Sequence, residues 1–327
     1  MSSTTSSRSR RPLCSAFSLE AGENPSGSAP SWEQCLVLEF PTPWRFDVLE
    51  NPNFPADVRN VLDQVDNMGR NTRLQCVNPD PEYSVDGKTR VMLFTRPDGP
   101  FTRFRREEYV VPAEMIGDLV DALLLNRNEL GNFSKFTQKT ENIRDIFVCT
   151  HGARDTCCAS FGSPIYQSLR NKYASKLGGS LRVWRMSHIG GHRLAPNLID
   201  MPDGRNWVRI TEAQLDQLVF RENTPSPLAS NYRGLIGLDS PFEMIAESEV
   251  FMREGWGMVG QPISTEMSFT SADEAKIRLT STNLSSGPLT YAVKVIRSGT
   301  VEYIKCLGDG TVEEEDQYIA TDIAKID

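Results

Sequence analysis

The amino-acid sequence predicts an α/β protein built from two similar units in tandem, with a small antiparallel β extension at its C-terminal end. Short apolar runs alternate with segments whose apolar residues recur at helical spacing, and the same order of such segments occurs twice along the chain. From residue 264 onward the pattern changes to short strands separated by turn residues.

The first unit is expected to contain four strands and two helices. Its first helix is predicted over residues 54–68, because four aliphatic residues recur there at helical spacing. Its second helix begins at Pro112, since proline is favoured in the first turn of a helix. The strands are expected at residues 35–40, 72–77, 90–95 and 102–111.

The second unit repeats this order. Its helices are predicted over residues 158–177 and 211–220, the latter with Thr211 as its N-cap. Its strands are expected at residues 145–149, 181–186, 195–201 and 205–210. A strand–helix–strand element followed by a hairpin and a helix is the minimal thioredoxin-like order. We therefore expect tandem thioredoxin-like units, of which only the second carries a cofactor site.

The domain boundaries follow from these elements. Residues 14–30 are expected to form a loop or arm, and the acidic run at 313–316 a solvated turn. The expected division is a disordered tail over 1–13, a degenerate thioredoxin-like domain over 14–140, a second thioredoxin-like domain over 141–225, a linker and helix over 226–260, and a small β-rich extension over 261–327.

The composition limits the possible classes of function. The chain has 327 residues, of which 24% are charged and 39% hydrophobic, as is typical of a globular protein. No apolar run approaches the roughly 20 residues that a membrane span requires, so no membrane partner is expected. The formal net charge of −8 argues against a general nucleic-acid binder, because such proteins neutralise phosphates.

Cysteine usage predicts the compartment. Seven cysteines, an odd number, are too few for a disulfide scaffold and fit a reducing compartment, so a cytoplasmic protein is expected. The first 13 residues are rich in Ser, Thr and Arg and contain no acid, so an organellar presequence and an organellar matrix are the alternative. A disordered tail is favoured, because the stretch is short and has no apolar face.

The distinctive chemistry lies between residues 149 and 192. This window contains all three histidines and three of the seven cysteines, whose side chains are soft metal ligands. Residues 149–158 read Cys-Thr-His-Gly-Ala-Arg-Asp-Thr-Cys-Cys, and residues 187–193 read Ser-His-Ile-Gly-Gly-His-Arg. The window therefore predicts a metal or iron–sulfur site.

The predicted elements bring four of these ligands together. Cys149 ends a strand and Cys158 lies near the start of the next helix, in the crevice where open α/β sheets bind ligands. His188 and His192 follow the next strand, and the two glycines between them let the backbone turn sharply. Two cysteines and two histidines suit either a [2Fe–2S] cluster or a tetrahedral zinc ion.

These two motifs resemble those of the sucrase/ferredoxin-like family (sucraseferredoxins), whose C-terminal half is similar to thioredoxin-like [2Fe–2S] ferredoxins. The resemblance covers roughly residues 14–255. It implies that the second unit is a thioredoxin-like ferredoxin domain, and that it binds a [2Fe–2S] cluster rather than zinc. It implies electron transfer or redox sensing with a redox partner protein as donor or acceptor. The ligands that it implies are Cys149, Cys158, His188 and His192.

Two neighbouring residues could act beside these ligands. Cys157 is adjacent to Cys158, so the two side chains point in different directions and only Cys158 is expected to ligate. His151 is either a substitute ligand or outer hydrogen-bond donor, or a loop histidine bonded to the backbone.

The remaining candidates for a supporting role are charged. Arg154 and Asp155 are expected either to pair with each other or to cap the helix that carries Cys158, rather than to take part in proton or electron transfer. Arg193 either supports the histidine loop or simply packs there. The other cysteines are expected to be isolated, buried structural thiols: Cys14, Cys35, Cys76 and Cys306.

Three functions other than electron transfer are possible for a chain with these residues. A zinc site could use the same four ligands. Thiol–disulfide exchange is disfavoured, because the chain has no Cys-x-x-Cys motif and a disulfide between Cys157 and Cys158 would be strained. Sucrose hydrolysis needs two facing carboxylates, and Asp155 is the only one beside the motifs. We therefore expect an electron carrier rather than a hydrolase.

Overall fold

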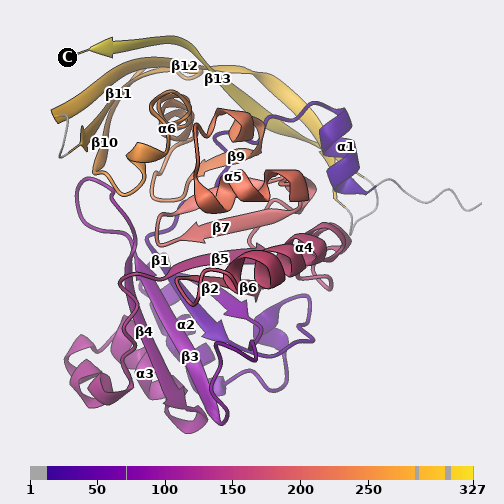
Figure 1. The fold of residues 1–327 in the computed structure, drawn as a ribbon, viewed down its shortest axis with the longest axis vertical. Coiled ribbons are helices and arrows are strands. Elements are labelled where there is room, and N and C mark those ends of the chain that lie inside the picture. Colours follow the sequence, from indigo (N-terminus) through magenta and orange to yellow (C-terminus); the bar gives the residue numbers. More distant parts are fainter. Residues whose placement is uncertain (1–12, 71, 284–286, 306–310, 327) are drawn as a thin grey trace, which may run out of the picture.

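The computed structural model of the chain (Figure 1) describes residues 13–70, 72–283, 287–305 and 311–326. The tail predicted over residues 1–13 lies outside these residues, except for its last position. The strands form a nine-stranded mixed sheet and a separate four-stranded antiparallel sheet. Among the described residues, no helix is long and apolar enough to cross a membrane.

The first unit has the predicted order of elements. They are β1 (Gln34–Glu39), α2 (Ala56–Asn67), β2 (Thr72–Val77), β3 (Lys88–Thr95), β4 (Arg105–Pro112) and α3 (Ile116–Leu124). Strands β1 and β2 are parallel and joined by α2, whereas β3 is antiparallel to β1 and β4 is antiparallel to β3. The four aliphatic residues that predicted α2 are all buried, which places that face of the helix in the core.

The second unit repeats both the order and the pairing. Its elements are β5 (Arg144–Cys149), α4 (Thr156–Ser168), β6 (Leu181–Met186), β7 (Asn197–Met201), β8 (Arg205–Val208) and α5 (Leu215–Phe220). The strand order β6-β5-β7-β8 corresponds to β2-β1-β3-β4 of the first unit. Parallel β5 and β6 and antiparallel β7 and β8 complete the match, which confirms the predicted tandem arrangement.

The two units share one sheet because β2 pairs with β6. They pair in antiparallel orientation through a single residue pair, Val77 and Met186, which are the last residues of their strands. The carboxyl ends of the parallel strands of both units therefore meet at this junction. Ligands of open α/β sheets bind beyond such ends, so the junction is the expected place for a site.

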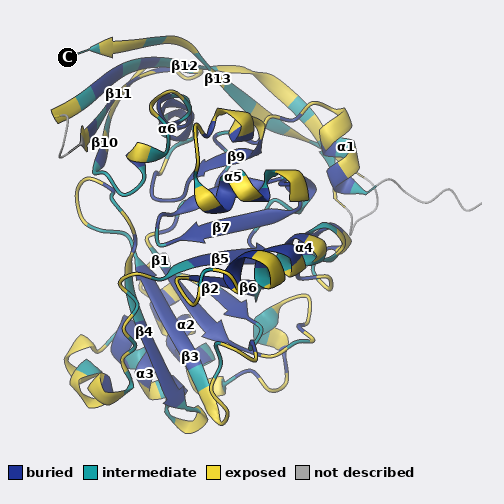
Figure 2. Ribbon diagram, viewed as in Figure 1, coloured by how far each residue is buried: buried dark blue, intermediate teal, exposed yellow. Residues whose placement is uncertain are grey.

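The remaining elements lie at the two ends of the chain. They are α1 (Cys14–Glu20), β9 (Tyr232–Leu235), α6 (Pro241–Glu254), β10 (Ile263–Ser271), β11 (Glu274–Asn283), β12 (Gly287–Ile304) and β13 (Val312–Ile326). Strand β9 extends the nine-stranded sheet from within the region predicted as linker and helix. Strands β10 to β13 form the predicted C-terminal sheet, which packs against α6. Figure 2 shows the buried inner strands and the exposed outer turns of α5.

Two local predictions are wrong. Helix α1 occupies the start of the predicted loop or arm. The sequence pattern did not predict this helix, because its buried residues are Cys14, Ser15 and Ser18, which do not form a periodic apolar face. The acidic run at 313–316 lies within β13 and is not a turn. Cations on neighbouring segments offset part of its negative charge; Arg193, for example, lies 3.1 Å from Glu315. An acidic stretch can therefore form a strand there.

A buried ionic network links the two units. Arg182 on β6 donates to both carboxylate oxygens of Glu108 on β4, at 2.8 Å each. The same guanidinium donates to both oxygens of Asp145 on β5, at 2.8 and 3.0 Å. Trp184 Nε1 donates to Asp145 at 2.7 Å, and Arg106 lies 3.0 Å from it. The two carboxylates are at most 1% exposed. Arg182 is the cation that hydrogen-bonds to both of them, while Arg90 pairs with Glu108 and Arg106 with Asp145.

We expect Arg182→Met to lower the free energy of unfolding by about 3–5 kcal/mol, because Glu108 and Asp145 would stay buried without this cation. Arg297→Met is a matched control, since Arg297 forms a more exposed ion pair with Asp316. The control should change stability by less than about 1 kcal/mol. Urea unfolding followed by circular dichroism measures both, and equal losses would contradict the role given to Arg182.

We expect Asp200 to contribute to the acid sensitivity of the fold. Burial would raise its pKa, but Arg144 and Arg221, each with a donor 2.7 Å away, outweigh burial and lower the pKa to about 2. A carboxyl group whose pKa is lower in the folded state stabilises the fold above its unfolded pKa of about 3.9. This contribution is lost as the pH falls towards 2. Asp200→Asn should therefore flatten the loss of stability from about pH 5 to 2, and an unchanged slope would refute this.

Candidate metal centre

The structure brings three of the four predicted ligands together. Cys149 is the last residue of β5, Cys158 lies in the first turn of α4, and His188 follows the end of β6. Their ligand atoms all lie within 4.8 Å of one another. Nδ1 of His188 is 3.6 Å from Sγ of Cys158, and both cysteines are buried. The end of β5, the start of α4 and the loop after β6 thus converge at the junction of the units.

Two local features set the position of Cys158. Asp155 caps α4, because its Oδ1 accepts a hydrogen bond from the backbone N–H of Cys157 at 2.8 Å. Gly162 then lets α4 approach β5 closely, since a Cβ atom at that position would lie 2.0 Å from the carbonyl oxygen of Cys149. The helix start and the close helix–strand contact together bring the two sulfur atoms to one point.

The cap confirms one of the two alternatives predicted for Arg154 and Asp155. In the described part of the chain, the carboxylate of Asp155 has its ion pair with His192. Arg154 stacks on Phe46, with its guanidinium carbon 3.9 Å from the ring centre.

The two buried sulfur atoms differ in proton affinity. The hydrogen bond from Cys158 lowers the pKa of Cys149 well below its usual range, against the effect of burial, and His188 lowers it further. The same hydrogen bond raises the pKa of Cys158, and burial adds to the increase. The lowered pKa favours the thiolate of Cys149, which is the form of cysteine that binds metal ions.

The first unit holds the backbone of His188. From β2, Arg73 Nη2 and Gln75 Nε2 donate to its carbonyl oxygen at 3.0 and 3.2 Å. Its N–H donates to Nδ1 of His151 at 3.2 Å, while Nε2 of His151 donates to the carbonyl oxygen of Arg45 at 2.8 Å. Burial lowers the pKa of His151, which favours the neutral ring. His151 is thus a loop histidine bonded to the backbone, the second of its predicted alternatives.

The fourth predicted ligand, His192, lies beside this group and not within it. Its ring centre is 5.9 Å from that of His188. Gly190 and Gly191 have φ angles of 103° and 68°, so the loop turns between the histidines as predicted. Nδ1 of His192 lies 3.1 Å from Oδ2 of Asp155. Metal-bound histidines commonly turn their second nitrogen to a carboxylate, which here leaves Nε2 for a metal.

Cys14 is a candidate that sequence reasoning misjudged. The sequence predicts an isolated thiol, but Sγ of Cys14 lies 3.4 Å from Sγ of Cys157 and 3.2 Å from Nδ1 of His192. The contact joins the start of α1 to the start of α4 over 143 residues of sequence, and no local pattern reveals such a pairing. The family resemblance reaching back to residue 14 was the available signal.

The other sequence candidates lie outside the ligand group. Arg193 pairs with Glu23 at 2.8 Å and with Glu315 at 3.1 Å, so it ties the histidine loop to the N-terminal arm and to β13. Cys35 and Cys76 are buried as predicted, and burial raises the pKa of Cys35 to about 12. Cys306 lies outside the described residues.

A pocket of about 310 Å³ opens beside the ligand group. Both units contribute to its walls, and His188 reaches it from the second unit. It therefore gives the ligand group a route to the surface at the junction. Residues around it include Phe46, Asp47, Arg73, His151, Arg154 and His188.

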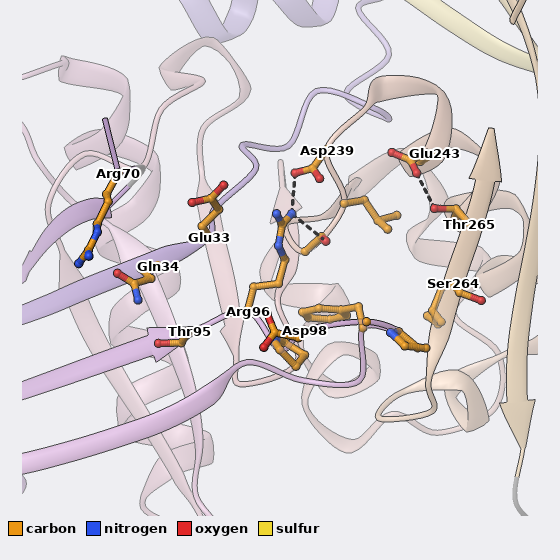
Figure 3. Close-up of a pocket in the computed structure, with 17 residues that line it drawn as sticks. Glu33, Gln34, Arg70, Thr95, Arg96, Asp98, Asp239, Glu243, Ser264 and Thr265 are labelled. Atoms are coloured by element: carbon orange, nitrogen blue, oxygen red, sulfur yellow. Dashed lines mark hydrogen bonds and ion pairs between the residues drawn. The ribbon is translucent and has the colours of Figure 1, made fainter. Parts of the chain in front are cut away.

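A larger pocket, of about 820 Å³, lies away from the ligand group, near β1, β3 and β10 (Figure 3). Arg96 donates to Asp239 at 2.5 Å, and with Ser31 it outweighs burial and lowers the pKa of that carboxyl. Glu243 accepts a hydrogen bond from Thr265. Each of these two carboxylates is thus engaged by its own neighbour.

We expect Gly162→Ala to reduce the metal bound per chain, because the new methyl group would push α4 away from the carbonyl of Cys149. The overpacking should also cost about 1–3 kcal/mol of stability. Gly131→Ala is the matched control, since a Cβ there would meet nothing within 4 Å. Elemental analysis and thermal unfolding measure both effects, and full metal content in Gly162→Ala would contradict the expectation.

The comparisons with known proteins agree with the motifs. The model of the sucrase/ferredoxin-like family matches residues 25–234, a range that contains all four predicted ligands. This match is narrower than the resemblance expected over residues 14–255, and it leaves out α1 and α6. Comparisons with curated proteins and with solved structures gave no match. The matched range covers more than half of the 327 residues of this chain, and the chain therefore belongs to the sucrase/ferredoxin-like family.

Proposed function

We propose that the protein binds a [2Fe–2S] cluster and acts in electron transfer or redox sensing. The observation that carries the proposal is the convergence of Cys149, Cys158 and His188 from three segments, with His192 beside them. Membership of the sucrase/ferredoxin-like family suggests a redox-related role. The four proposed ligands are the two cysteines and the two histidines.

The donor set fits this cofactor. Clusters with mixed ligation are held by cysteine thiolates and histidine nitrogens. Cys149 supplies a thiol of lowered pKa, and Asp155 orients His192 so that Nε2 remains for iron. In a two-iron cluster each iron has its own pair of protein ligands. His192 can therefore be a ligand even though it lies outside the group of Cys149, Cys158 and His188.

The residues around the ligands define what the site can do. When bound, the cluster would accept and release one electron. The contact of α4 with β5 fixes both sulfur atoms, and Gln75 and His151 fix the backbone of His188. The junction pocket beside His188 is the approach that we propose for a redox partner protein. An odd number of cysteines fits a reducing compartment, so we propose the cytoplasm or an organellar matrix.

Mixed ligation has a consequence for the reduction potential. Four thiolates on the oxidised core give a net charge of −2, whereas two thiolates and two neutral imidazoles give 0. An added electron meets less negative charge in the second case. The potential should therefore lie well above that of ferredoxins with four cysteine ligands, as it does when histidines replace cysteines in Rieske centres.

We expect the anaerobically purified protein to be coloured and to give an EPR signal after reduction. Cys149→Ala or Cys158→Ala should abolish both signals, because each removes a proposed iron ligand. Cys35→Ala is the control, since that thiol is buried in β1 and belongs to neither cluster of metal-ligating side chains. A colourless protein with stoichiometric zinc at these ligands would contradict the proposal.

We expect His188→Cys and His192→Cys each to lower the reduction potential, because an additional thiolate raises the negative charge around the cluster. Redox titration followed by EPR measures the shift in each variant. A potential that does not change in His192→Cys would remove His192 from the ligand set, while a decrease in both variants supports all four ligands.

A further inference from the structure

A second group of metal-ligating side chains lies beside the first. Sγ of Cys14, Sγ of Cys157 and a carboxylate oxygen of Asp155 lie within 4.8 Å of one another, and all three residues are buried. Nδ1 of His192 joins them, at 3.2 Å from Sγ of Cys14 and 3.1 Å from Oδ2 of Asp155. The cluster proposed above uses none of these four donor atoms.

The spacing of the donors is close to the edges of a tetrahedron around zinc. Zn–S bonds of about 2.3 Å and Zn–N or Zn–O bonds of about 2.1 Å place neighbouring donors roughly 3.3–3.8 Å apart. The two sulfur atoms are 3.4 Å apart, within this range, whereas Sγ of Cys14 lies 3.9 Å from Oδ1 of Asp155 and the two contacts of His192 Nδ1 are a little shorter than the range. Donors from α1, from the start of α4 and from the histidine loop thus meet at distances suited to one small ion.

The local charge also favours a cation. Asp155 is 1% exposed, and among the described residues the one basic side chain within 4.0 Å of its carboxylate is His192, whose pKa is lowered by burial so that the neutral ring is favoured. No lysine or arginine of the described part of the chain approaches its carboxylate within 4.0 Å. A carboxylate and two thiolates are costly to bury together, and a divalent ion would offset their charge.

We propose that Cys14, Asp155, Cys157 and Nδ1 of His192 bind a zinc ion. Two sulfur, one nitrogen and one oxygen ligand complete a four-coordinate sphere, so the site is structural. It fastens α1 to the start of α4 and to the histidine loop. If both sites are filled, His192 bridges them as an imidazolate, because each ring nitrogen binds a metal and the Nδ1 proton passes to solvent. The zinc ion then offsets the negative charge that this adds to the two neutral imidazoles counted above. The bridge rests on the cluster proposed above, whereas the zinc site itself does not.

The test uses the full-length Cys149→Ala/Cys158→Ala double variant, which lacks the sulfur ligands of the first site. After treatment with a chelator and a reductant, it should bind one Co²⁺ per chain. Thiolate-to-cobalt charge transfer and strong d–d bands would report a tetrahedral site, and Zn²⁺ should displace the Co²⁺. Adding Cys14→Ala or Cys157→Ala should abolish these bands, whereas adding Cys35→Ala should leave them unchanged.

A rescue variant separates ligand loss from misfolding. Cys14→His keeps a donor at this position, so it should retain tetrahedral cobalt with weaker charge transfer, because one thiolate remains. Circular dichroism and thermal unfolding show whether each variant is folded. The absence of a tetrahedral spectrum in the double variant, or a spectrum that survives Cys14→Ala, would overturn the zinc site.

Elemental analysis of the wild-type protein distinguishes the two proposals. If both hold, each chain carries two irons and one zinc, and the zinc is lost in Cys14→Ala. Zinc that depends on Cys14 without any iron would overturn the cluster alone. Iron without zinc would overturn the second site alone.

Discussion

The buried guanidinium of Arg182 is the interaction on which the arrangement of the two units depends. Within the sheet their strands pair only at Val77 and Met186, although Phe104 N–H also donates to the carbonyl oxygen of Pro202 and one hydrophobic core contains residues of both units. Arg182 adds a directional constraint to this packing, because it binds Glu108 of the first unit and Asp145 of the second with four hydrogen bonds. A charge network in the core therefore helps to fix the junction that holds the candidate ligands.

The candidate site combines constraints of short and long range. A helix cap at Asp155 and a close contact at Gly162 place Cys158 beside Cys149, and both depend on neighbours in the sequence. The position of His188 also depends on the first unit, because Arg73 and Gln75 of β2 donate to its carbonyl oxygen. Cys149 and Cys158 are thus positioned within the second unit, whereas residues of both units hold the backbone of His188.

Sequence reasoning succeeded where the determinants are local. Periodic apolar residues indicated the strands and longer helices, and strand ends and paired glycines indicated which candidate ligands lie near one another. It failed where the determinant is a distant contact. Helix α1 has seven residues and no apolar period, and Cys14 meets Cys157 over 143 residues. The acidic run at 313–316 forms a strand because distant cations such as Arg193 neutralise it.

The meeting of carboxyl ends at one junction also constrains how such a protein can evolve. The first unit has none of the histidines, yet it contacts two of them. The carbonyl oxygen of Arg45 bonds to His151, and Gln75 donates to the carbonyl oxygen of His188. The two units are therefore not interchangeable. A chain shortened to the second unit would expose the edge of β6 and lose the partner that holds His188. The second unit therefore depends on the first for the arrangement of its candidate site, and deletion of the first unit would disrupt that arrangement.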